Sequence, residues 1–319
     1  MTEILEKQKP PFLSLVISLF ISTTIVILIL FYLRENDINL EIINNIQPID
    51  FLFIFVTHSI FVLLMSIFNK ILINTIDPNV SLLDCIFLQY VNIFFNKLFL
   101  KGGGLYRAIY LKRKYYFSYT LFISTFAGAF LIIVSSQLCI GIISMILIYL
   151  FFGRINLIIF FIYLIISIII LMIYKLQPKF KKGSNWVVNK INRVTAGWQI
   201  IKNKPGTISN LLLISIFTVV IQAVQLLVIY KSMKFDINYL EVLYLSSLSI
   251  ILVFINITPD GIGIRESLYA FSSDIVNISR PNLILGSLIL RTITFIIASI
   301  VGIISYSILE YRLFYGDNQ

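Results

Sequence analysis

Three charged side chains occur in apolar segments that offer them no obvious compensation. They are Arg265, Glu266 and Arg291. An arginine or a carboxylate at the centre of a bilayer costs about 2.5–3.5 kcal/mol on insertion scales, so each charge needs a partner. Two explanations stay open. The charges form an ion pair that locks a turn against the last helix, or the arginines bind an anionic group as bidentate donors.

The turn before Arg265 consists of residues that bend the backbone. It includes Pro259, Asp260, Gly261 and Gly263. Proline ends the preceding helix, the glycines permit a tight turn, and the aspartate is expected to cap the next helix. Free N–H groups at the helix start near Gly263 would strengthen an anion site.

A second glycine cluster lies in the first half of the chain. The apolar run 86–100 is shorter than the roughly 20 residues that a spanning helix needs, and it contains Asn96. Glycines including Gly103 follow, and then Arg107. This pattern predicts a re-entrant hairpin that enters from the cytoplasm and turns near residues 102–104. Asn256 and Arg265 occur in a similar order, and paired broken segments indicate a transporter binding site or, alternatively, a chance likeness.

The composition predicts an all-α polytopic membrane protein. The 319 residues are 59% hydrophobic and 13% charged, whereas soluble domains are about 45–50% apolar and about 25% charged. Seven stretches are predicted to span the membrane, in addition to the two hairpins. They are 12–33, 49–68, 117–152, 155–174, 209–230, 239–257 and 281–309. The stretch 117–152 is either one helix or two helices broken near Gly141.

Basic residues set the predicted orientation. The formal net charge is +10, and residues 175–209 carry many lysines and no acid, which places this loop in the cytoplasm next to anionic lipid. Its part 185–201 has the pattern of an amphipathic interfacial helix. The prediction is a single membrane domain, 1–319, with halves 1–174 and 210–319 around this loop. The N-terminus is expected inside and the C-terminus outside.

Other chemistry finds little support in the residue types. Two scattered cysteines and one histidine, His58, predict neither a metal site nor a cofactor, and His58 is expected to be a packed histidine. We find no catalytic motif and expect no catalytic residues and no enzyme activity. A membrane-embedded transferase would have only Asp77 and Asp84 as candidate carboxylates at the cytoplasmic side. The positive charge is explained by topology, so we expect no nucleic-acid partner.

The chain resembles the lysylphosphatidylglycerol synthase transmembrane region family, also called flippase-like or UPF0104 proteins. In the second half the matching residues are Pro259, Gly261, Gly263, Arg265, Glu266 and Arg291. In the first half they are Asn96, Gly103, Arg107 and the run Tyr110-Leu111-Lys112. In the best understood members, the resemblance implies, this region moves a lipid across the membrane and a separate synthase domain makes that lipid. The synthase domain has no counterpart in these 319 residues.

The sequence and the resemblance together predict a lipid translocase of the prokaryotic cytoplasmic membrane. Its substrate would be an anionic or zwitterionic phospholipid or a polyprenyl-phosphate-linked glycan, used in cell-envelope biogenesis. The arginines would bind the phosphate, and Glu266 would hold the arginines or bind a cationic head group. The alternatives are a non-transporting partner of envelope-synthesis enzymes and a glycolipid transferase.

Overall fold

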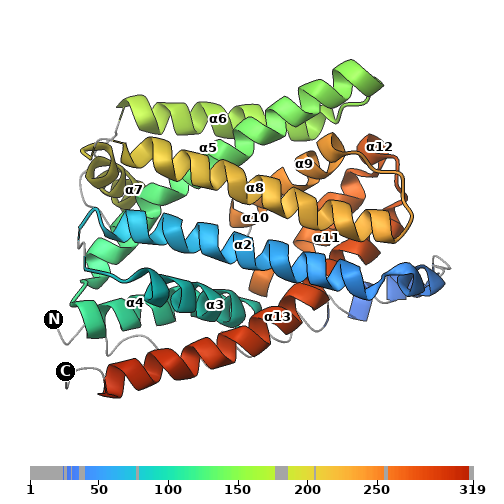
Figure 1. Cartoon of the computed structure of the whole chain (residues 1–319). Helices are drawn as coiled ribbons and strands as arrows, with labels where there is room; N and C mark the ends of the chain where they lie inside the picture. Colours follow the sequence, from blue (N-terminus) through green and yellow to red (C-terminus); the bar gives the residue numbers. More distant parts are fainter. Residues whose placement is uncertain are drawn as a thin grey trace.

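The computed structural model describes residues 24, 27–29, 31–35, 40–76, 79–176, 186–204, 206–254 and 258–315. Within these ranges the chain is helical and has no strand (Figure 1). The elements, in chain order, are η1 Leu40–Asn45, α2 Pro48–Ile73, α3 Leu82–Leu98, α4 Gly102–Tyr115, α5 Tyr119–Phe152, α6 Leu157–Leu176, α7 Trp186–Lys202, α8 Thr207–Ser232, α9 Tyr239–Ser247, α10 Ser249–Phe254, η2 Pro259–Gly261, α11 Ile264–Phe271, α12 Ser273–Val276 and α13 Arg280–Tyr315.

Five of the described helices are long and apolar enough to cross a membrane. They are α2, α5, α6, α8 and α13. The all-α membrane fold is therefore confirmed, and α5 is one continuous helix. The predicted span 12–33 lies largely outside the described residues. The predicted span 239–257 differs from a single crossing, because it forms the short helices α9 and α10.

The first hairpin consists of α3 and α4, which pack against each other. Lys101 adopts a left-handed conformation, with φ of 60°, and thereby reverses the chain between the two helices. A Cβ atom at Gly103 would lie 2.1 Å from the backbone oxygen of Asn92, so only glycine permits this approach of the two backbones. The predicted re-entrant hairpin is therefore present, and its tip is at residues 99–102.

The second hairpin consists of α9 and α10, followed by η2, α11 and α12. Asp260, Gly261 and Gly263 have positive φ angles of 52°, 70° and 85°, which turn the chain sharply before α11 begins. The tips of the two hairpins meet, because η2 contacts α3. Asn256, the proposed counterpart of Asn96, lies outside the described residues.

The two halves repeat one order of elements in opposite directions. A long helix, a hairpin and a second long helix occur as α2 to α5 and again as α8 to α13 (Figure 1). The α3–α4 hairpin occupies the end of the molecule at which α7 lies, and α9 to α12 occupy the other end. This arrangement resembles the inverted repeats of many transporters.

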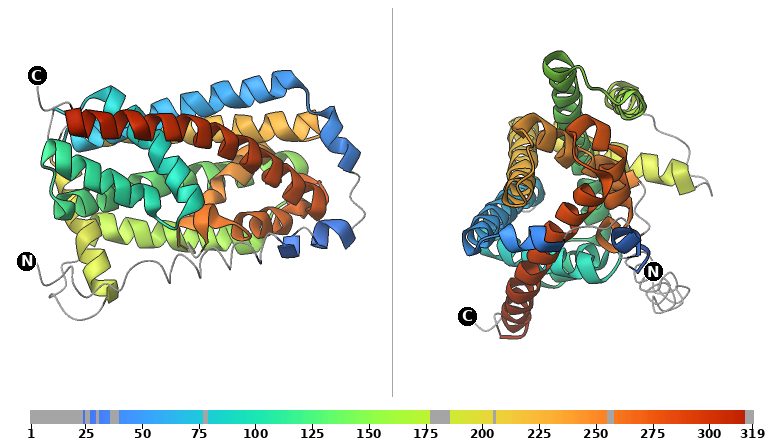
Figure 2. Two further views of the ribbon diagram at one scale, coloured as in Figure 1. Left: turned by 90° about the horizontal axis from the view of Figure 1, so that it is seen from below. Right: turned by 90° about the vertical axis from the view of Figure 1, so that its right-hand side faces the viewer.

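The end of α13 and the helix α7 lie at the same end of the molecule. Figure 2 shows the last turns of α13 near the end that carries α7, and Arg312 of α13 bonds Asp84 at the start of α3. The prediction placed loop 175–209 inside and the C-terminus outside, whereas the structure places the end of α13 at the same end of the molecule as α7. The reason is that α9 and α10 do not complete a crossing, so α13 returns to the starting side.

The helix α7 is present where an amphipathic helix was predicted, but it packs on protein. A Cβ atom at Gly197 would lie 1.7 Å from the backbone oxygen of Ser124 in α5, so the two helices are in close backbone contact. The ring of Trp198 is buried 4.6 Å from the ring of Tyr174. The side chain of Trp186 lies outside the described residues.

Candidate functional site

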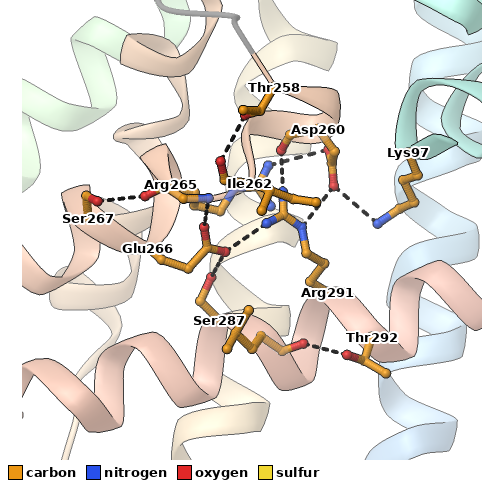
Figure 3. A network of polar contacts seen from close by, with 12 residues as sticks. Lys97, Thr258, Asp260, Ile262, Arg265, Glu266, Ser267, Ser287, Arg291 and Thr292 are labelled. Carbon is orange, nitrogen blue, oxygen red and sulfur yellow. Dashed lines mark hydrogen bonds and ion pairs between the residues drawn. The ribbon is translucent and has the colours of Figure 1, made fainter. Parts of the chain in front are cut away.

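A network of charged groups joins the second hairpin to α13 and to the tip of the first hairpin (Figure 3). Its centre is Asp260, whose carboxylate lies 3.3 Å from Arg291 Nε, 3.4 Å from Lys97 Nζ and 3.8 Å from Arg265. Arg291 also donates to the backbone carbonyl of Asp260. Three elements that are distant in sequence, α3, η2 and α13, are therefore held together by one carboxylate.

Glu266 forms the second anchor of this network. Its carboxylate accepts hydrogen bonds from Arg291 at 2.9 Å, from the Gly263 N–H at 2.8 Å and from Ser287 at 3.3 Å. Glu266 is buried, and these three donors already engage both of its carboxylate oxygens. The Gly263 N–H, predicted to face an anion, is already bonded by this side chain.

The predicted ion pair is therefore present, and it divides the three charges by role. Arg291 is bonded to both Asp260 and Glu266, so it locks the turn against the last helix. Among the described residues Arg265 forms one ion pair, with Asp260 at 3.8 Å, and its Nε has no hydrogen-bond partner there. Arg265 keeps donors available for a ligand, whereas the guanidinium of Arg291 is largely used within the protein.

A polar cavity lies beside this network. Its volume is about 300 Å³, and its wall comes from α2, α3, α8, η2, α11, α13 and the α9–α10 segment. The charged lining residues are Lys97, Asp260, Arg265 and Arg291. The amide and imidazole groups on the wall are Gln89, Asn92, Asn96, Gln222, Gln225 and His58. A space of this size is near the lower limit for small-molecule sites.

The residues of the first hairpin do not all reach this cavity. Asn96 lines it and accepts a hydrogen bond from the Gly103 N–H at 3.0 Å. Gly103 itself is a packing position between α3 and α4. Arg107 is buried outside the lining residues and donates to Asn69 at 3.3 Å and to Gln89 at 2.5 Å. The proposed joint phosphate site of Arg107 with the other arginines is therefore not assembled.

Pro259, Gly261 and Gly263 shape the turn but do not line the cavity. Pro259 is the first residue of η2 and is buried. Gly261 lies against Leu252, because a Cβ atom added at Gly261 would lie 3.2 Å from a methyl carbon of the leucine. Their role in this structure is to place Asp260 and Arg265 at the cavity wall.

Sequence reasoning missed three residues of the wall. Lys97 ends an apolar helix and carried no signal, because its partner Asp260 follows 163 residues later. His58 was expected to be a packed histidine, and a glutamine in a span such as Gln225 ordinarily forms a hydrogen bond across helices. Both are buried, and His58 Nε2 and Gln225 Nε2 lack hydrogen-bond partners among the residues described here.

The carboxylate proposed for a transferase is engaged elsewhere. Asp84 is buried and accepts hydrogen bonds from Lys114 at 2.7 Å, Tyr115 at 2.6 Å and Arg312 at 2.6 Å. Burial raises the pKa of Asp84, but these donors outweigh it and hold the pKa below its usual value. Asp77 lies outside the described residues.

The described ranges contain no group of three histidine, cysteine, aspartate or glutamate side chains that could hold a metal ion.

Comparison with known proteins supports one family. The model of the lysylphosphatidylglycerol synthase TM region matches residues 12–302. No curated protein and no solved structure matches the chain. The match includes both hairpins and all five membrane-crossing helices except the end of α13, so it covers the whole functional architecture. The chain belongs to the lysylphosphatidylglycerol synthase transmembrane region family.

Proposed function

We propose that this membrane protein translocates lipid and acts as a transporter, not as an enzyme. The observation that carries the proposal is the polar cavity at the meeting point of two re-entrant hairpins, among helices with apolar outer surfaces. Non-helical backbone at membrane depth occurs where it lines a cavity or is covered by protein. A head group would enter this cavity while its acyl chains stay in the surrounding lipid.

The physical barrier to lipid flipping is the passage of a charged head group through hydrocarbon. A cavity wall with Lys97, Arg265 and several amide groups would replace part of the hydration shell of a phosphate. Arg291 would hold the wall in shape through Asp260 and Glu266. The candidate substrates are an anionic or zwitterionic phospholipid and a polyprenyl-phosphate-linked glycan.

The inverted arrangement of the hairpins supports alternating access from the two ends. We place the basic segment 175–204, together with the end of α13, at the cytoplasmic face of a prokaryotic cell membrane. Its lysines would contact anionic lipid there. Enzymes of envelope synthesis are candidate partners that supply or consume the translocated lipid.

The test is lipid scrambling in liposomes. Purified protein is reconstituted with head-group-labelled lipids, and a membrane-impermeant quencher measures the fraction of label that it reaches. We expect the quenched fraction to exceed that of protein-free liposomes, and Arg265→Gln to slow the exchange. A matched control is Arg154→Gln, which removes an arginine paired with Glu241 at a distance from the cavity.

Two results would contradict the proposal. Absence of exchange for every labelled lipid, with folded protein in the liposomes, would favour the non-transporting partner of envelope-synthesis enzymes. Equal slowing by Arg265→Gln and Arg154→Gln would show that exchange does not proceed through the cavity.

A further inference from the structure

We infer that the cavity selects a net-negative head group that combines one phosphate with a small hydroxyl-bearing group, in preference to a zwitterionic head group. The inference rests on the proposed function and narrows its substrate class. It is carried by three properties of the cavity: the balance of its charges, the unpartnered donors on its wall and its volume.

The charge balance of the wall favours an anion. Lys97, Arg265 and Arg291 line the cavity, and among the described residues Asp260 is the one carboxylate on its wall. All three cations contact that carboxylate. Positive charge therefore remains in excess, and an ammonium group in the cavity would meet no carboxylate that lacks a cationic partner. Glu266 is not a lining residue of this cavity and is bonded to Arg291.

Three residues that line the cavity each have a buried polar atom without a hydrogen-bond partner among the described residues. Arg265 Nε and Gln225 Nε2 are donors, and neither has a hydrogen-bond partner among the described residues. His58 Nε2 is also without one within that part of the chain. Buried polar groups normally have partners. A phosphate would satisfy the arginine, and hydroxyl groups, which both donate and accept, match an amide and an imidazole.

The volume limits the size of the head group. A volume of about 300 Å³ lies at the lower end of the range for small-molecule sites. A phosphate with a glycerol-sized or single-sugar group fits such a space. An oligosaccharide is larger than this volume and would extend out of the cavity, so only a small head group could be surrounded by the wall.

The opposing possibility is capture of a quaternary ammonium by aromatic rings. Phe61 and Tyr269 are the two aromatic lining residues, and aromatic faces attract such cations. The excess of positive charge on the same wall opposes this mode. A choline head group is therefore the most informative competitor.

The experiment measures binding apart from transport. The full chain in detergent is heated with dioctanoyl phosphatidylglycerol, dioctanoyl phosphatidylcholine or dioctanoyl phosphatidylethanolamine, and the rise in unfolding temperature gives the apparent Kd of each. We expect dioctanoyl phosphatidylglycerol to bind at least about tenfold more tightly than either zwitterionic lipid. The loss of one hydrogen bond to a charged group produces a ratio of this size.

Two variants locate the preference. Gln225→Leu should weaken binding of phosphatidylglycerol about two- to tenfold, the loss expected for one hydrogen bond to a neutral hydroxyl group. Gln137→Leu is the matched control, because Gln137 is also buried with an unpartnered amide oxygen within the described chain but does not line the cavity. It should leave the Kd unchanged. The ranking of lipids by the unmodified protein needs no variant, so the inference remains testable if Gln225→Leu fails to fold.

The outcomes separate the inference from the proposed function. Tight binding of phosphatidylglycerol without scrambling would keep the head-group assignment and overturn the transport proposal. Scrambling with equal binding of all three lipids, or tighter binding of the choline lipid, would overturn the head-group assignment alone. Failure of every lipid to raise the unfolding temperature would also overturn the assignment.

Discussion

The pairing of Arg291 with Glu266 leads to a quantitative prediction about stability. The two side chains are 11% and 2% exposed, and their closest atoms are 2.9 Å apart. Removing one partner of a buried pair costs about 3–5 kcal/mol, because the other charge is left without compensation. Asp260 keeps Lys97 and Arg265 after the change, so most of the loss should come from Glu266. We therefore expect Arg291→Met to lower the free energy of unfolding by about 3 kcal/mol.

A double-mutant cycle isolates this pair. Arg291→Met, Glu266→Gln and the double variant are unfolded reversibly in mixed detergent micelles, with helicity followed by circular dichroism. Neighbouring charged residues give interaction energies of about 0.5–3 kcal/mol, and this buried contact should lie in the upper half of that range. Lys231→Met is the control, because Lys231 and Asp236 form an exposed pair at 3.5 Å and should contribute nothing measurable.

The reasoning would be refuted by an interaction energy near zero. It would also be refuted if Arg291→Met changed stability no more than Lys231→Met. Either result would mean that Arg291 does not lock the turn, and that the arginine is free for a ligand after all.

Three further predictions concern packing, pH and topology. Gly103→Ala should lower the free energy of unfolding by about 1–3 kcal/mol or more through overpacking against Asn92. Gly104→Ala is the control and should be neutral or stabilising, because the position of its Cβ atom is open space. Denaturant unfolding of both variants measures the difference. The pKa of Asp84 is lowered in the folded state despite the opposing effect of its burial. Its stabilising contribution is therefore present above the ordinary carboxyl pKa of about 4 and is lost as the pH falls through the lower folded value. In Asp84→Asn the free energy of unfolding should fall less steeply as the solution is acidified. Single cysteines placed at the end of α13 and in α7 should react with an impermeant thiol reagent from the same side of the membrane, and labelling from opposite sides would contradict the fold.

Much of the fold could be predicted because membrane helices leave a strong signal in sequence. The apolar stretches now seen as α2, α5, α6, α8 and α13 were identified by length and composition alone. The possible break at Gly141 was undecidable, because a glycine in an apolar run marks either a break or a close contact. The structure shows contact: a Cβ atom there would lie 2.1 Å from the ring of Tyr163.

The topology of the second half could not be predicted from hydrophobicity. The run 239–257 is apolar enough for a span, but the helical part ends at Phe254 and the chain turns at Asp260, which has a positive φ angle. An apolar hairpin buried in protein and an apolar helix in lipid have the same composition, so only the packing of α9 against α5 and α8 distinguishes them. Because α9 and α10 do not complete a crossing, the end of α13 lies at the end of the molecule that carries α7.

The candidate site was predicted only in part for a similar reason. Arg265, Glu266 and Arg291 were conspicuous because charge in an apolar segment is rare. Lys97 and His58 were not, because a lysine at a helix end and a histidine in a span have ordinary structural roles. Their importance depends on distances across the fold, such as the 3.4 Å between Lys97 and Asp260, which no local pattern records.

The most direct test of the central claim asks whether a lipid head group occupies the polar cavity. A phospholipid with a photoreactive diazirine in its head group is reconstituted with the protein and activated, and the labelled peptides are mapped by mass spectrometry. We predict labels on the lining residues Phe61, Ile93 and Leu290, which excess unlabelled phosphatidylglycerol should suppress. Labels confined to lipid-facing residues such as Ile143 and Ile300, which are exposed on the apolar outer surface, would contradict the account.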